Sequence, residues 1–90
     1  MSRLQILEIK QEVEFLKIWI DRNQREKFWK LKRLDRVNQY LTFAGKEPAR
    51  RYRFEKAKLE KQIYKLDDEI EADQEKFVQL SKGLERLSRV

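Results

Sequence analysis

An apolar seam that repeats in steps of four and three residues runs unbroken from Tyr52 to Leu87, and nine of its eleven positions are apolar or aromatic. A repeat of about 3.5 residues stays on one side of a helix only if the helix supercoils around a partner. This half of the chain therefore predicts a coiled-coil helix. The seam positions are Tyr52, Lys56, Leu59, Ile63, Leu66, Ile70, Asp73, Phe77, Leu80, Leu84 and Leu87.

The first half of the chain carries a second seam, which begins at Ile6 and ends at Leu41. Its steps are also three and four, but two consecutive steps of four, Ile20 to Gln24 to Phe28, predict a stutter that locally relaxes the supercoil. The segment 4–43 holds no Gly or Pro, so one continuous helix is expected there. The expected seam is Ile6, Ile9, Val13, Leu16, Ile20, Gln24, Phe28, Leu31, Leu34, Asn38 and Leu41.

The segment 44–48 separates the two seams and is the predicted turn. Gly45 is a candidate for the left-handed residue that ends a helix, and Pro48 suits the first turn of the next one. At the other end of the chain, Ser2 is available to cap the first helix. We therefore expect a single domain that spans 1–90, with a second helix at 49–88.

Folding the chain back at this turn brings the two seams face to face over their whole length. Leu34 then meets Leu59, and Leu16 meets Phe77. Asp73 falls close to Gln24, where the first seam is also polar, and a buried polar layer of this kind can fix register. The predicted fold is all-α: a long antiparallel two-helix coiled-coil hairpin.

Several apolar residues lie outside both seams. They either widen the same core or form a surface through which the hairpin dimerises into a four-helix bundle or docks on a larger partner. We favour the second interpretation, because a two-helix core has no room for both tryptophans. The candidate protein-interface residues are Leu7, Phe15, Ile18, Trp19 and Trp29.

The charge of the chain is concentrated around the turn. Residues 25–65, hereafter the tip, hold fourteen Lys and Arg against five Asp and Glu, a net +9, and the remaining residues carry −3. Arg binds phosphates through paired hydrogen bonds, and neighbouring aromatic rings can stack on unpaired bases. The alternatives are a solvated helix face, an acidic protein surface, or the acidic end of a second copy. Candidate nucleic-acid or anion-binding residues are Lys30, Lys32, Arg33, Arg36, Arg50, Arg51 and Arg53.

The sequence lacks the residues that most catalytic and metal sites use. It has no Cys and no His, and its two glycines are too far apart for a phosphate-binding loop. Adjacent carboxylates do not share a helix face. We predict no catalytic residue, metal ligand, cofactor or small-molecule substrate. No apolar run approaches the ~20 residues that span a bilayer, so a soluble, intracellular, cytoplasmic protein with no membrane contact is expected.

These observations favour a non-catalytic interaction or assembly protein whose basic tip binds an anionic partner, with nucleic acid, DNA or RNA, as the best match. The alternative is a structural or adaptor subunit that self-associates or binds a protein and does not bind nucleic acid. In shape, the expected hairpin is similar to small helical hairpins that pair into four-helix bundles, some of which bind RNA. It is also similar to the coiled-coil arms of larger assemblies, although fold does not imply function.

Overall fold

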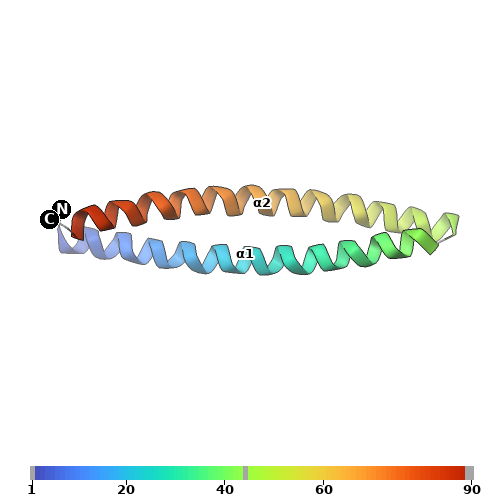
Figure 1. Cartoon of the computed structure of the whole chain (residues 1–90), viewed down its shortest axis with the longest axis horizontal. Helices are drawn as coiled ribbons and strands as arrows, with labels where there is room; N and C mark the ends of the chain where they lie inside the picture. The colour runs from blue at the N-terminus through green and yellow to red at the C-terminus, as the bar shows by residue number, and fades with distance from the viewer. Residues whose placement is uncertain (1, 44, 89–90) are drawn as a thin grey trace.

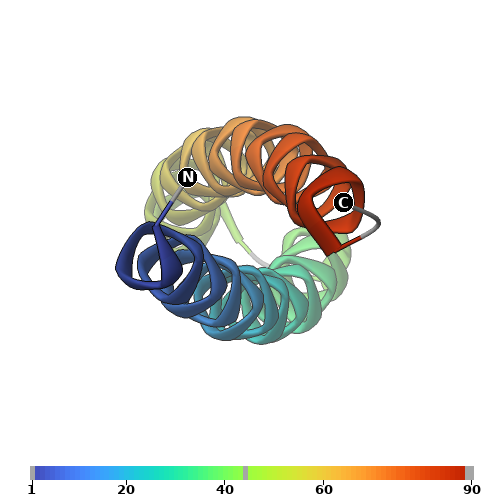
Figure 2. The same cartoon turned by 90° about the vertical axis from the view of Figure 1, so that its left-hand side faces the viewer.

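The computed structural model describes residues 2–43 and 45–88, which form two long antiparallel helices (Figure 1). Helix α1 spans Arg3–Phe43 and helix α2 spans Lys46–Ser88. The molecule is a rod of 66 × 17 × 14 Å. Seen from the end, the two helices wind around a common axis (Figure 2), as a 3.5-residue repeat requires. The predicted all-α helical hairpin is therefore confirmed.

The start of α1 is capped by a reciprocal pair of hydrogen bonds. The backbone N–H of Gln5 donates to the Ser2 hydroxyl at 3.2 Å, and the backbone N–H of Ser2 donates to Gln5 Oε1 at 3.0 Å. This arrangement is a capping box, in which two polar groups at the helix start satisfy each other. Ser2 thus caps the helix as predicted.

The turn between the helices is tighter than predicted, and α2 begins at Lys46, before Pro48. The carbonyl oxygen of Gly45 accepts the backbone N–H of Ala49 at 2.9 Å, which is the first hydrogen bond of the helix. Gly45 does not have a positive φ, so the prediction of a left-handed residue at this position was wrong. Gly45 instead occupies the N-cap of α2, where glycine is also favoured.

The seam of α2 is the one that the sequence predicts. Four consecutive seam residues at its centre are each only 7–8% exposed: Leu59, Ile63, Leu66 and Ile70. The polar seam residue Asp73 is partly buried. This unbroken stripe is the larger part of the core between the two helices.

The seam of α1 differs from the prediction in its second half. Asn23 is buried and Val37 is completely buried, whereas Phe28 is 52% exposed and Leu31 is 43% exposed. The predicted stutter is wrong, because the seam keeps steps of three and four along the whole helix. Since the facing seam of α2 never changes its repeat, α1 must keep the same repeat to remain in contact with it. The observed positions are Ile6, Ile9, Val13, Leu16, Ile20, Asn23, Lys27, Lys30, Leu34, Val37 and Leu41.

Two lysines therefore occupy seam positions of α1. The side chains of Lys27 and Lys30 are only 33% and 24% exposed. Their ammonium groups leave the seam on opposite edges of the rod, Lys27 toward Asp67 and Lys30 toward Gln62. The aliphatic stems cover the apolar residues of α2 while the charges stay in solvent. This is how Ile63 and Leu66 remain buried opposite lysines.

Candidate anion-binding tip

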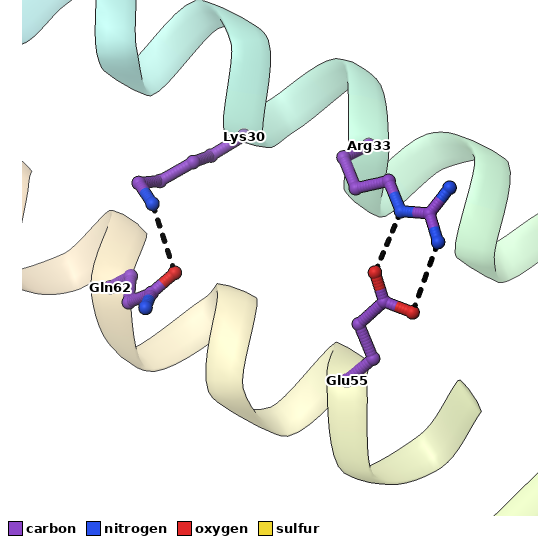
Figure 3. A network of polar contacts seen from close by, with 4 residues as sticks. All are labelled: Lys30, Arg33, Glu55 and Gln62. Carbon is purple, nitrogen blue, oxygen red and sulfur yellow. Dashed lines mark hydrogen bonds and ion pairs between the residues drawn. The ribbon is translucent and has the colours of Figure 1, made fainter. Parts of the chain in front are cut away.

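Part of the positive charge of the tip is used to hold the two helices together. Arg33 of α1 forms a two-pronged ion pair with Glu55 of α2 (Figure 3), with Nε to Oε1 at 2.6 Å and Nη2 to Oε2 at 3.2 Å. The hydrogen bond from Arg33 lowers the pKa of the Glu55 carboxyl, and the same bond raises the pKa of Arg33. This pair clamps the helices in register on one edge of the rod, which we call the first edge.

Lys30 lies on the first edge as well, one turn before Arg33. Its ammonium group donates to Gln62 Oε1 at 3.0 Å (Figure 3) and lies 3.7 Å from Glu26 Oε1. Lys30 and Arg33 were both predicted to bind an anion. In the structure each already has a partner within the hairpin, so each attracts an added anion less strongly than an unpaired cation would.

Lys32 lies on the outer side of α1, away from α2. Its ammonium group is 4.6 Å from the centre of the Phe28 ring and 5.2 Å from that of Trp29. These distances are within the range of cation–π attraction, which leaves the charge exposed to solvent. The two rings are nearly perpendicular to each other, with centres 5.9 Å apart. Lys32 can therefore contact an anion, but on a different side of the rod from Arg33.

Four arginines at the tip are exposed and form no ion pair with any side chain that the structure describes: Arg36, Arg50, Arg51 and Arg53. Their helical positions divide them between the two edges of the rod. Arg36 and Arg51 fall on the first edge, and Arg50 and Arg53 fall on the opposite, second edge. The predicted basic residues thus surround the tip and do not form one continuous face.

At the tip, the seam residue Tyr52 forms a ring contact that the sequence analysis did not predict. Tyr40 of α1 and Tyr52 of α2 have ring centres 5.1 Å apart with a tilt of 34°. Beside them is an open hollow of about 450 Å³ lined by Pro48, Arg51, Tyr52 and Glu55. An exposed guanidinium beside aromatic rings is an arrangement that can hold a phosphate and a base together.

Glu55 and Tyr40 were missed by the sequence-based prediction, although the sequence contains the signal. Arg33 directly precedes the seam residue Leu34, and Glu55 directly precedes Lys56. In an antiparallel coiled coil, these flanking positions meet across the same edge. Tyr40 directly precedes Leu41 in the same way, so all three residues could be assigned to the first edge from the seam alone.

The five predicted interface residues of α1 are all exposed, between 50% and 66%. Their exposure excludes the alternative in which they widen the core between the helices. Trp19 is covered on one side by the guanidinium of Arg22, which lies 5.5 Å from its ring centre. The remaining apolar area of these residues faces solvent: Leu7, Phe15, Ile18, Trp19 and Trp29.

Over the residues that the structure describes, neither helix contains a stretch that is both long and apolar enough to cross a membrane. No protein-family model, curated protein or solved structure is significantly similar to this chain.

Proposed function

We propose that this hairpin is a non-catalytic interaction protein whose basic tip binds an anionic partner, and that the partner is nucleic acid. The observation that supports this most strongly is the set of four exposed arginines at the tip without an ion pair among the described side chains. A cationic surface of this density attracts polyanions over long distances and binds them by releasing counterions.

Exposed aromatic rings among the arginines favour a single-stranded nucleic acid as the partner. Phe54 is 76% exposed and adjoins Arg53, and Phe43 is 88% exposed at the end of α1. Stacking of a base on such a ring contributes about 1–3 kcal/mol and does not depend strongly on sequence. An acidic protein surface would use the arginines but would gain little from these rings. The arrangement of the arginines on both edges suits a flexible strand that wraps around the tip.

A second function, protein assembly, is favoured by a separate observation. The outward-facing side of α1 exposes Phe15, Ile18 and Trp29 at 62–66% each. Large apolar side chains exposed along one face mark a candidate interaction site in a water-exposed protein. We propose that α1 docks on a protein or on a second copy of the hairpin, to give a four-helix assembly from which the tip projects.

The tip proposal is tested by the binding of a fluorescent 20-nucleotide single strand at several salt concentrations. We expect the double variant R36Q/R51Q to bind more weakly than the wild type. Its slope in a plot of log affinity against log salt should also be lower by about 0.7 for each phosphate that the variant no longer neutralises. The matched control is K82Q/R86Q, which removes the same charge at the opposite end of the rod.

Two outcomes would contradict the proposal. One is the absence of a complex with the wild type at low salt. The other is an equal loss of affinity in R36Q/R51Q and in K82Q/R86Q, because that result would show that net charge alone, wherever it lies, governs binding. Circular dichroism of each variant would verify that the hairpin is still folded.

A further inference from the structure

The side of α1 that faces away from α2 carries a second repeat with the same spacing as the seam. Its positions follow one another in steps of four and three residues over the first two thirds of the helix. The apolar members are 62–66% exposed. Among the described side chains of α2 there is no equivalent, since the exposed Phe54, Tyr64 and Val78 are widely separated. We call this surface the outer stripe: Leu4, Glu8, Gln11, Phe15, Ile18, Arg22, Arg25 and Trp29.

The order of residues in the outer stripe is complementary to itself when the stripe is reversed. An antiparallel copy would place Leu4 against Trp29, and Phe15 against Ile18 of the second copy. It would also place Glu8 against Arg25, and Gln11 against Arg22. Each pair of facing residues then consists either of two apolar side chains or of an arginine and a hydrogen-bond acceptor. Because the pairing is symmetric, every contact occurs twice about a two-fold axis.

We propose that the outer stripe binds a second copy of this chain, antiparallel and in this register. The inference rests on the assembly role proposed above for α1 and gives the partner and its orientation. The dimer is a row of four helices, with the two α1 helices in the middle. The part of each tip nearest the turn, which carries Arg36, Arg50, Arg51 and Arg53, projects at opposite ends of the dimer and remains free to bind nucleic acid.

Charge decides between the antiparallel arrangement and a parallel one. In a parallel dimer in register, the apolar residues would still meet, but Glu8 would face Glu8 of the second copy, and Arg22 and Arg25 would each face their own counterparts. Like charges opposed across an interface are strongly unfavourable. The antiparallel arrangement replaces these repulsions with two Glu8–Arg25 ion pairs and two Gln11–Arg22 contacts.

The charges that the proposal needs are accessible. In the hairpin, Arg25 forms an ion pair with Asp21, one turn earlier, at 3.1 Å. Both side chains are well exposed, at 77% and 60%, and such surface pairs within a helix are weak. Arg25 can therefore turn toward a partner at little cost. Glu8 is exposed near the opposite end of the stripe and is too distant to reach Arg25 of its own chain.

The estimated size of the interface is near the lower limit for a specific dimer. The stripe from Leu4 to Trp29 is about 38 Å long at 1.5 Å per residue. Phe15 and Trp29 are about two-thirds exposed, and with the 150–250 Å² that an aromatic side chain can bury, they add roughly 200–300 Å² per chain. With the aliphatic residues and the flanking Trp19, the total approaches the lower limit of about 1,200 Å² for a specific interface.

The test is a charge exchange followed by analytical ultracentrifugation over a range of protein concentrations. The wild type should show an equilibrium between the 11.1 kDa monomer and a species of twice that mass. E8R and R25E should each weaken dimerisation roughly tenfold or more, because each creates two like-charge contacts. The double variant E8R/R25E should recover wild-type dimerisation, since the pairs are restored with their signs exchanged.

The matched control is E75R, which makes the same charge change on the outer face of α2 and should leave the dimer unchanged. Helical content measured by circular dichroism identifies any variant that is unfolded, and E8R and R25E provide independent readouts. The proposal is overturned if the wild type is monomeric at all concentrations, if neither single variant weakens the dimer, or if the double variant dimerises as weakly as the single variants.

The assay that measures binding of the single-stranded nucleic acid is independent of these results. A dimer without nucleic-acid binding therefore refutes only the tip proposal, and the reverse result refutes only the dimer.

Discussion

Substitution of Val37 by Ala tests whether the seam of α1 passes through the residues that the structure shows. Among the residues that the structure describes, Val37 is the one large side chain that is completely buried, and it lies within the layer that faces α2. Removal of two buried methyl groups costs about 1.6 kcal/mol in transfer free energy at about 0.8 kcal/mol per group. The cavity left behind adds up to about 1 kcal/mol. Because Ala is the better helix former by about 0.5 kcal/mol, the net loss is about 2 kcal/mol.

The comparison that makes this prediction informative is the substitution of Phe28 by Ala. Phe28 belongs to the seam expected from the sequence, where its loss would cost about 3–5 kcal/mol. In the structure it is 52% exposed, and its ring lies against Trp29 and Lys32 of the same helix. We therefore expect F28A to lose about 1 kcal/mol or less, after the gain in helix propensity. The smaller substitution should thus be the more damaging one.

Both variants are measured by thermal and urea unfolding, followed by circular dichroism at one protein concentration for all samples. In a domain of this size, 1 kcal/mol corresponds to a shift of about 4–8 °C in Tm. V37A should then melt about 8–16 °C below the wild type, and F28A within about 8 °C of it. The observed seam is refuted if F28A is the less stable variant, with V37A close to the wild type.

Three further predictions concern single positions. Because the pKa of Glu55 is lowered, its ion pair with Arg33 contributes fully to the stability of the fold at pH values above 4.5, the ordinary pKa of a Glu carboxyl. This contribution is lost as the pH falls through the lowered pKa. Urea unfolding should thus show a steeper loss of stability with acidification in the wild type than in E55Q, and parallel curves would contradict this. Gly83 lies within α2 and does not have a positive φ, and a methyl group added to it would meet no atom within 4 Å. The variant G83A should therefore be more stable than the wild type by about 0.5–1 kcal/mol, as measured by urea unfolding. Asn23 is a buried polar residue at the level of Ile70 in the seam. The variant N23L should have a higher Tm than the wild type, because an apolar side chain then replaces the buried polar one. A lower Tm would show instead that Asn23 makes a stabilising contribution.

The architecture of the molecule follows from the seam of α2. From Tyr52 to Leu87 the repeat of four and three is so regular that it determines the supercoil and the need for a partner helix. The scarcity of Gly and Pro between the ends of each half then leaves a single position for the turn. The hairpin and the capping role of Ser2 could therefore be predicted from local rules.

The second half of the α1 seam could not be predicted in this way. A search for apolar residues selects Phe28 and Leu31 over Lys27 and Lys30, because hydrophobicity is the primary signal of a seam. The structure selects the lysines, because their stems are apolar and the continuous seam of α2 imposes its repeat on α1. The deciding interaction lies between distant segments of the chain, so it is not visible within either segment alone.

The candidate site was predicted in composition but not in arrangement. The count of basic residues places the positive charge at the tip, and exposed Arg50, Arg51 and Arg53 agree with this. The seam assigns Arg33 and Glu55 to the same edge of the rod, but the ion pair between their side chains is visible only in the folded hairpin, where the two helices meet. The residue types thus establish the sign of the tip, whereas the tertiary structure decides which charges are free.

The position of the two chain ends has a practical consequence. The start of α1 and the end of α2 lie together at the end of the rod opposite the turn (Figure 1), so a short peptide that joins these two helix ends could close the hairpin into a ring. Such backbone cyclisation would restrict the unfolded chain and prevent fraying at the open end, while the turn stays unaltered at the far end. The same geometry allows either terminus to be attached to a solid support with the arginine-bearing bend directed outward, about the length of the rod away.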